Sequence, residues 1–276
     1  MGLFDNCLLA CDIDGTLMIN GYINPINVEK IEYFMSEGGS FSISTGRSVL
    51  AISDVLNTLK RVSPSIVANG CMIYDYENEK IVYENVLPES DHYLANEIIN
   101  SGIKAGIEVH CGTNAYTVNR TELVTEHQVY EKFDAPDVTV EEITNKKWHK
   151  VICALDSAEE RDQLKAHMLK YESNCDFIET CAIIGGEFRN YFELVPTGVS
   201  KASALKELCK ILNIKEGGLF AIGDYYNDVQ MLKLADISAV PCDSPEDVKA
   251  LAEYITKTCE DGAVADFIDY LTNLMR

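Results

Sequence analysis

The sequence predicts an α/β protein in which a doubly wound parallel sheet is interrupted by an inserted α+β domain. Short apolar runs alternate with helical patterns in residues 1–80 and 197–276, and each apolar run ends in a polar side chain. Strands that alternate with helices form a parallel sheet covered on both faces. Residues 81–196 show a different pattern of paired strands beside helices. We therefore expect two core segments, 1–80 and 197–276, and an inserted domain at 81–196.

The strand ends carry the first functional signal. The apolar runs at 8–11, 41–43, 66–68, 219–222 and 237–240 are followed by Asp12, Ser44-Thr45-Gly46-Arg47, Asn69-Gly70, Gly223-Asp224 and Pro241-Cys242-Asp243. In open parallel sheets, ligands bind outside the carboxyl ends of the strands. We expect all five strand ends to lie along one edge of one sheet.

Helical spacing of apolar residues predicts the elements between these strands. In the core we expect helices at 27–35, at 200–213 with Ser200 as its cap, and at 262–274, and a helix that begins with Pro245. In the inserted domain we expect helices near 89–101, 122–132 and 157–171, and strands at 106–111, 115–119, 148–155, 175–182 and 190–195. The last two strands would turn around Gly185-Gly186.

Composition limits the possible partners and compartment. The formal net charge is −21, from 44 acidic and 23 basic residues, which argues against nucleic acid and anionic membranes as partners. The N-terminal residues lack a signal-peptide pattern, and no apolar run reaches the length of a membrane span. The 10 cysteines are scattered without a CxxC pair. We expect a cytoplasmic protein without disulfides or zinc, and no obligate protein partner is evident.

Two acidic clusters point to a cation. Asp12 and Asp14 stand two residues apart, so an extended backbone points them to the same side. Asp224, Asn227 and Asp228 add three oxygen-bearing side chains at the same predicted edge. Oxygen ligands without His or Cys favour Mg²⁺. The alternatives are Asp-Gly turn chemistry for the first cluster and a helix cap for the second.

Two basic residues could bind phosphate near these carboxylates. Arg47 follows a strand end that offers hydroxyl groups and freed backbone amides. Lys201 lies in the first turn of its helix, where a cation opposes the helix dipole and therefore needs another reason to be present. An ordinary solvated lysine is the alternative. Together with a carboxylate able to attack phosphorus, these groups predict a phosphoryl-transfer site.

Four ordered motifs, DxDGT, STGR, GVSK and GDxxND, resemble those of the haloacid-dehalogenase-like phosphatases, and the large insert resembles their Cof-like branch. The resemblance spans nearly the whole chain. It implies a Rossmann-like core, a cap domain that covers the site, Mg²⁺ as cofactor and a small phosphorylated metabolite as substrate.

The resemblance also implies residue roles. Asp12 would be the nucleophile, and Asp14 the general acid and then the base, with its backbone carbonyl on Mg²⁺. Thr45 and Lys201 would hold the transferring phosphoryl group. Asp224 would ligate the metal with support from Asn227 and Asp228, and Arg47, Asn69 and Gly70 would contact the substrate.

We therefore expect a Mg²⁺-dependent phosphatase that acts through an aspartyl phosphate on a sugar phosphate, a nucleotide or a cofactor phosphate. A phosphomutase and a non-catalytic protein that binds or senses a phosphorylated metabolite are the alternatives. One departure stands out: Cys242-Asp243 replaces the Gly-Asn that the family often carries after its last strand. We assign no role to Asp243.

Overall fold

The computed structural model describes residues 2–184 and 187–276, and the chain folds into two compact units. The first unit comprises Met1–Gly46, Ser53–Tyr83 and Ser200–Arg276, and the second comprises Arg47–Ile52 and Glu84–Val199. The predicted turn at Gly185-Gly186 lies outside the described residues. Among the described helices, none combines the length and the apolar composition needed to cross a bilayer.

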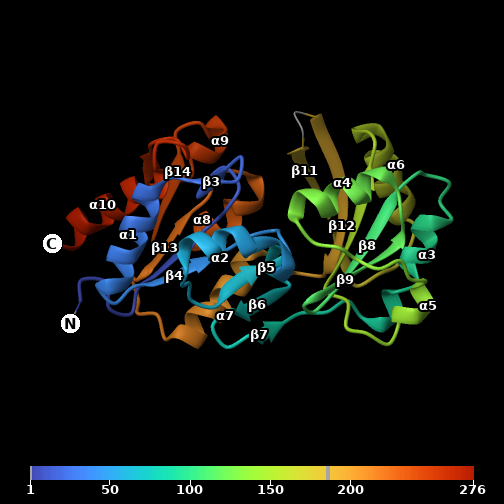
Figure 1. Ribbon diagram of the computed structural model, residues 1–276, viewed down its shortest axis with the longest axis horizontal. Helices are drawn as coiled ribbons and strands as arrows, with labels where there is room; N and C mark the ends of the chain where they lie inside the picture. The colour runs from blue at the N-terminus through green and yellow to red at the C-terminus, as the bar shows by residue number, and fades with distance from the viewer. Residues whose placement is uncertain (1, 185–186) are drawn as a thin grey trace. The chain divides into compact units, whose positions relative to one another are not determined.

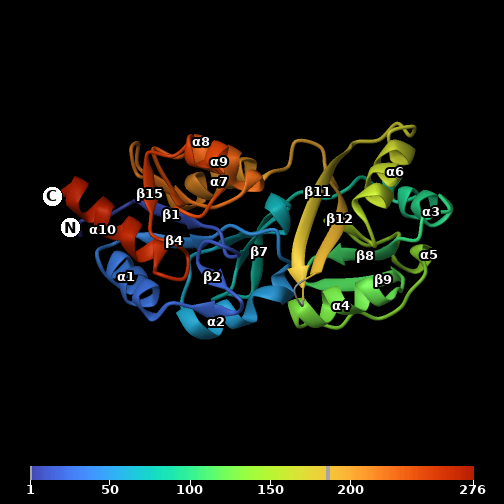
Figure 2. The same cartoon turned by 90° about the horizontal axis from the view of Figure 1, so that it is seen from above.

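A five-stranded parallel sheet organises the first unit. Its strand order is β15 (Tyr254–Thr256), β14 (Ile237–Pro241), β13 (Leu219–Ile222), β1 (Leu8–Cys11) and β4 (Ser40–Ile43). Strand β1 lies at the point where the winding changes direction, because β4 follows on one side and β13, β14 and β15 extend on the other. Figure 1 labels β4, β13 and β14 of this sheet, and Figure 2 labels β1 and β15. The backbone amide of Asp12 donates to Ile222 at 3.0 Å, so this residue is fixed directly at the switch point, where ligands bind in such sheets.

Helices cover both faces of this sheet, as in other doubly wound proteins. Helix α1 (Pro25–Ser36) packs against α10 (Ala263–Met275) on one face, and α7 (Lys201–Leu212) packs against α8 (Val229–Leu234) on the other (Figure 2). Residues Leu8, Leu205 and Leu208 share a buried apolar cluster between the sheet and α7. The helices of this unit are α1 (Pro25–Ser36), α2 (Ser53–Leu59), α7 (Lys201–Leu212), α8 (Val229–Leu234), α9 (Glu246–Lys249) and α10 (Ala263–Met275). The predicted α/β fold is therefore confirmed.

The strand predicted at 66–68 does not belong to this sheet. Strand β5 (Ser65–Val67) pairs antiparallel with β6 (Met72–Asp75), which together with β7 (Lys80–Glu84) forms a separate three-stranded sheet. The chain reverses tightly at Ala68, Asn69 and Gly70, all three with positive φ, and so favours the local hairpin over an extended parallel pairing. A single bridge between Ser44 and Ile66 still ties β5 to the end of β4.

Three further details differ from the predictions. The fifth place in the parallel sheet is taken by β15, whose three residues were too short to predict. A hairpin of β2 (Met18–Ile19) and β3 (Tyr22–Ile23) follows the first acidic cluster. Pro245 is the N-cap of α9 and not its first helical residue.

The second unit contains a five-stranded antiparallel sheet with helices. The strand order is β11 (Cys175–Ile184), β12 (Glu187–Pro196), β10 (Lys150–Leu155), β8 (Gly106–Cys111) and β9 (Asn114–Asn119). The helices are α3 (Leu94–Ile99), α4 (Glu122–Glu131), α5 (Val140–Ile143) and α6 (Ala158–Met168). One apolar core joins one face of the sheet to α3 and α6, with Ile98 and Leu164 among its fully buried members. An inserted α+β domain is thus confirmed.

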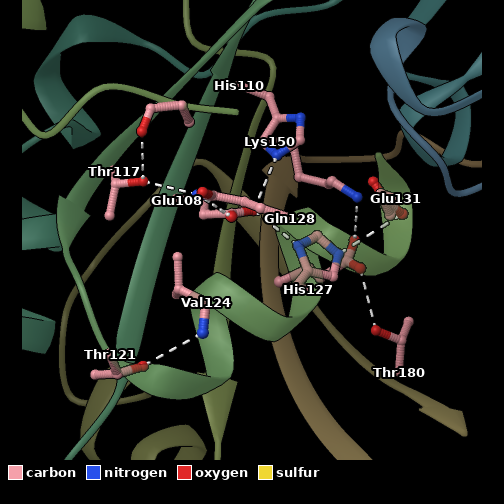
Figure 3. Close-up of polar contacts among 12 residues, drawn as sticks. Glu108, His110, Thr117, Thr121, Val124, His127, Gln128, Glu131, Lys150 and Thr180 are labelled. Atoms are coloured by element: carbon pink, nitrogen blue, oxygen red, sulfur yellow. Dashed lines mark hydrogen bonds and ion pairs between the residues drawn. The ribbon is translucent and has the colours of Figure 1, made fainter. Parts of the chain in front are cut away.

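The opposite face of this sheet buries charged side chains beneath α4 (Figure 3). Glu108 Oε2 lies 2.9 Å from His127 Nδ1, and Glu108 Oε1 accepts a hydrogen bond from Gln128 at 2.7 Å. The other ring nitrogen of His127 lies 3.6 Å from Glu131 Oε1. Nearby, Lys150 pairs with Glu193 at 3.3 Å. The contacts of Glu108 with His127 and Gln128 join α4 to strand β8, whereas the His127–Glu131 pair lies within α4 and the Lys150–Glu193 pair lies within the sheet.

The charge on His127 should make the stability of the second unit depend on pH. Burial by itself lowers the pKa of His127, but Glu131 and Glu108 outweigh burial and raise this pKa to about 10. A pKa above the unfolded value of about 6.5 contributes stability that is complete below that value and disappears as the pH rises through the folded pKa. We expect the free energy of unfolding to fall between about pH 7 and pH 10.

Urea unfolding measured across this pH range checks the prediction. In His127→Gln the fall attributable to this histidine should be absent, and the protein should be less stable than wild type at pH 6 to 7. His167→Gln is the matched control, because His167 lies on α6 and takes no part in the contacts of α4 with Glu108. The fall of its unfolding free energy with pH should match that of wild type. Equal pH dependence in wild type and His127→Gln would show that the ion pairs of His127 do not hold α4 to the sheet.

Candidate functional site

Asp12, Lys201 and Asp228 form a buried ion cluster at the carboxyl end of the parallel sheet. Asp12 directly follows β1 and is 6% exposed, and Lys201 is the first residue of α7. Lys201 Nζ donates to Asp12 Oδ1 at 2.5 Å and to Asp228 Oδ1 at 2.6 Å. The alternative of a solvated lysine is therefore wrong, because the Lys201 side chain is 1% exposed.

The local sequence places the lysine where a cation is otherwise unfavourable. Ser200 caps α7: its hydroxyl accepts a hydrogen bond from the amide of Ser203 at 3.1 Å, while the Ser203 hydroxyl accepts one from the Ser200 amide at 2.9 Å. The capped helix start holds Lys201 against Asp12 and Asp228, and these carboxylates compensate for the unfavourable helix dipole.

Burial and ion pairing have opposite effects on the pKa values of Lys201 and Asp12. Burial tends to lower the pKa of Lys201, but Asp12 and Asp228 raise it above its ordinary value, so the ammonium stays charged. Burial raises the pKa of Asp12, and Asp228 and Asp224 add to this rise while Lys201 counteracts it. Buried charges persist only when they are paired in this way.

Asp224 completes a group of three convergent carboxylates. It follows β13, and its side chain accepts a hydrogen bond from Thr16 Oγ1 at 3.1 Å. Burial and the neighbouring Asp228 raise the pKa of Asp224 to about 7. Oxygens of Asp12, Asp224 and Asp228 lie within 4.8 Å of one another, close enough to hold one cation together.

The loop after β13 is shaped around Asp228. Asp228 Oδ2 accepts backbone hydrogen bonds from Asp224 at 3.1 Å and from Tyr225 at 3.3 Å. Asp228 thus organises the loop and also contacts Lys201.

Gly15 shows how closely the first motif approaches Asp224. This glycine has φ of +85°, and a Cβ on it would stand 2.4 Å from Asp224 Oδ2. Any other residue would be strained by the positive φ and would collide with the carboxylate. The turn Asp14-Gly15-Thr16 therefore requires glycine at position 15. Thr16, which donates to Asp224, is a residue of the candidate site that was not predicted from the sequence.

The two remaining predicted metal ligands, Asp14 and Asn227, belong to the same motifs but are exposed at the protein surface. Asp14 is exposed and forms an isolated bridge with Met18 at the start of the hairpin. Asn227 is exposed within a short 3₁₀ turn (Tyr226–Asp228). The structure thus brings together Asp12, Asp224 and Asp228, and it leaves the Asp14 and Asn227 side chains facing solvent.

The second and third strand ends meet through backbone contacts. The amide of Thr45 donates to Ile66 at 3.0 Å, and the amide of Asn69 donates to the Thr45 carbonyl at 3.1 Å. Both side chains are buried. Gly70 packs against the start of α7, where a Cβ would stand 2.2 Å from the Ser200 carbonyl oxygen. Gly70 therefore helps to position the helix that carries Lys201.

Arg47 belongs to the second compact unit, whereas the other predicted site residues belong to the first. Its guanidinium lies 5.8 Å from the ring centroid of Tyr130, and Nη1 donates to the Ala51 carbonyl at 3.1 Å. Stacking of this kind suits arginine and fixes its orientation. Its role toward a substrate stays a prediction.

Comparisons with known proteins agree with this fold. A family model described as haloacid dehalogenase-like hydrolase matches residues 9–268. A Streptococcus pyogenes protein with a provisional phosphatase name is 31% identical over 272 residues, which is 95% of this chain and 96% of the relative. A Bacillus subtilis protein named 5-amino-6-(5-phospho-D-ribitylamino)uracil phosphatase is 27% identical, and the match covers 92% of each chain.

A solved structure shows the same fold across both units. This structure is described as a sugar phosphatase of subclass IIB of the haloacid dehalogenase superfamily. It superposes with a TM-score of 0.80 at 21% identity, and the match covers 96% of this chain and 99% of that chain. Together with the family model, this likeness confirms the resemblance carried by the four sequence motifs. The chain belongs to the haloacid dehalogenase-like hydrolase family.

Proposed function

We propose that the protein is a Mg²⁺-dependent phosphatase that hydrolyses a small phosphorylated metabolite through an aspartyl phosphate at Asp12. The buried contact of Lys201 with Asp12 and Asp228 carries this proposal. A buried lysine paired with two carboxylates is not explained by stability alone, because apolar residues of similar volume would stabilise the fold as well. Full-length relatives with phosphatase names agree with a phosphoric monoester hydrolase.

The set of three convergent carboxylates is suited to Mg²⁺. Asp12, Asp224 and Asp228 supply only oxygen donors, and Lys201 by itself leaves an excess of negative charge on the three carboxylates, which a divalent cation would compensate. Asp12 and Asp224 would hold the ion, with the Asp14 carbonyl and the side chains of Asn227 and Asp228 in support. When bound, Mg²⁺ would neutralise negative charge on the phosphate and on the nucleophile.

In the first step an Asp12 carboxylate oxygen attacks phosphorus, and the bond from phosphorus to the ester oxygen breaks. Lys201 holds Oδ1, so we assign the attack to Oδ2. Lys201 and Thr45 stabilise the negative charge on the transferring phosphoryl group. Asp14 gives its proton to the leaving oxygen, which departs as an alcohol.

In the second step water attacks the phosphorus of the aspartyl phosphate. Asp14, now deprotonated, takes a proton from this water, and the bond from phosphorus to Asp12 breaks. Inorganic phosphate leaves and Asp12 is regenerated. The exposure of Asp14 suits both roles, because its carboxyl must exchange protons with ester and water in turn.

Relatives narrow the proposed substrate. One relative is named for a phosphate on a ribityl chain that carries a uracil ring, and one structural neighbour is named as a sugar phosphatase. Both names describe a phosphate on a sugar or sugar-alcohol chain. Among sugar phosphates, nucleotides and cofactor phosphates, we therefore propose the esters that carry phosphate on a sugar or sugar-alcohol chain as the first substrates to examine.

The test is phosphate release from a panel of these esters, with Mg²⁺ and with a chelator. We expect release with Mg²⁺, near-complete loss with the chelator, and recovery when Mg²⁺ is restored. Isomerised sugar phosphate without free phosphate would instead show a phosphomutase. Mg²⁺-dependent binding without release, across the whole panel, would show a protein that senses a phosphorylated metabolite.

A further inference from the structure

Two exposed tyrosines stand between Asp224 and Asp228 in the sequence. Tyr225 follows Asp224, Tyr226 begins the turn that ends at Asp228, and the two tyrosines are 46% and 53% exposed. Their rings meet edge to face, with centroids 4.8 Å apart and an interplanar angle of 68°. Single exposed aromatic residues are ordinary on protein surfaces, but a contacting pair next to a reaction centre calls for an explanation.

Hydrogen bonds hold the side chain of Tyr226 and the backbone of Tyr225, although both residues are exposed. The Tyr226 hydroxyl donates to Asp247 Oδ1 of α9 at 3.3 Å. The Tyr225 amide donates to Asp228 Oδ2, and the Tyr225 carbonyl accepts from the Asp228 amide at 3.0 Å. A surface whose backbone and side chains are already ordered loses little entropy when a ligand binds to it.

We infer that Tyr225 and Tyr226 form an aromatic platform that stacks against a planar heteroaromatic ring in the leaving group of the substrate. This inference rests on the proposed function, because it assumes that a phosphate ester binds at Asp12. Both tyrosines belong to the same short segment as Asp224 and Asp228, so we expect a ring stacked on them to belong to the molecule whose phosphate lies at these carboxylates.

The charge of the protein favours such a contact. With a net charge of −21, the chain repels phosphate esters at long range. Stacking against an uncharged ring supplies binding energy that does not depend on charge. Binding energy from a remote part of the substrate can also orient the phosphate for attack.

The experiment compares two esters that differ at C1 of the ribose, which carries a pyrimidine ring in one and a hydroxyl group in the other. Uridine 5′-monophosphate and ribose 5-phosphate share the phosphorylated ribose, and only the first carries a pyrimidine. We expect wild type to prefer the ring-bearing ester in kcat/KM. The double variant Tyr225→Ala/Tyr226→Ala should lose roughly 10-fold or more on this ester, as for removal of one stacking contact, and should change little on ribose 5-phosphate.

Two single variants refine the assignment. Tyr226→Phe keeps the ring but loses the hydrogen bond to Asp247, so it should retain most of the preference. Tyr93→Ala is the control: it removes a tyrosine that is 40% exposed in the second unit. The ratio of its kcat/KM values for the two esters should equal that of wild type.

Binding gives a readout that does not need turnover. In an Asp12→Asn background, calorimetry with Mg²⁺ present should show tighter binding of uridine 5′-monophosphate than of ribose 5-phosphate, and the platform variant should abolish the difference. A wild type without preference for the ring-bearing ester, or a preference that survives the double variant, would overturn the platform while leaving the phosphatase intact. Absence of phosphate release from every ester, with the binding preference present, would overturn the proposed function and leave the platform.

Discussion

Replacing Asp12 with asparagine is expected to lower kcat for phosphate release by at least about 10³-fold, as for other enzymes that lose their nucleophile. Asparagine has nearly the same shape but attacks phosphorus poorly. The fold should persist, because Lys201 keeps Asp228 as a charged partner at 2.6 Å. Steady-state phosphate release on the preferred ester measures the effect, and circular dichroism confirms folding.

The matched control is Asp156→Asn, which changes an exposed aspartate in the second unit. Its kcat should remain within about twofold of wild type, as is usual for surface substitutions. Substantial activity in a rigorously purified Asp12→Asn protein would mean that another group attacks phosphorus.

Replacing Lys201 with methionine should affect stability and activity together. The substitution leaves Asp12 and Asp228 buried without their shared cation, which typically costs about 3 to 5 kcal/mol in the free energy of unfolding. The transferring phosphoryl group also loses a positive partner, so kcat should fall by roughly 10²-fold or more. Urea unfolding and steady-state kinetics measure the two effects separately.

A double variant separates these two effects. Lys201→Met/Asp228→Asn removes one of the two uncompensated carboxylates, so the unfolding free energy should recover in part relative to Lys201→Met. Activity should not recover, because the lysine is still missing. Equal stability of wild type and Lys201→Met would contradict the ion cluster, and recovered activity in the double variant would contradict the role of Lys201 in transfer.

The ends of the parallel strands were the most predictable part of the site. Asp12 and Asp224 follow apolar runs in a chain that alternates strands and helices, so the topology alone brings them to one edge. The burial of Lys201 could not be predicted in the same way. A lysine at a helix start looks solvated in sequence, and only the approach of α7 to Asp12 and Asp228 shows its pairing.

Other features were missed because the sequence pattern was ambiguous. Residues 66–68 were predicted as another strand of the parallel sheet, but the positive φ angles at residues 68–70 place β5 in a hairpin with β6. The strand at 106–111 was predicted, but the partners of its polar side chains were not: helix α4 covers Glu108 and His110, so both side chains are buried. Such coverage depends on tertiary packing, which local periodicity does not encode.

The covalent state of Asp12 during turnover is the most direct test of the mechanism. An aryl phosphate such as p-nitrophenyl phosphate has a leaving group that needs little protonation, so breakdown of the phosphoryl enzyme should limit its turnover. Rapid acid quench followed by borohydride reduction converts an aspartyl phosphate to homoserine, which peptide mass spectrometry locates. We predict homoserine at residue 12, dependent on substrate and absent from Asp12→Asn. An unmodified Asp12 under steady turnover, or a phosphorylated residue elsewhere, would contradict the account.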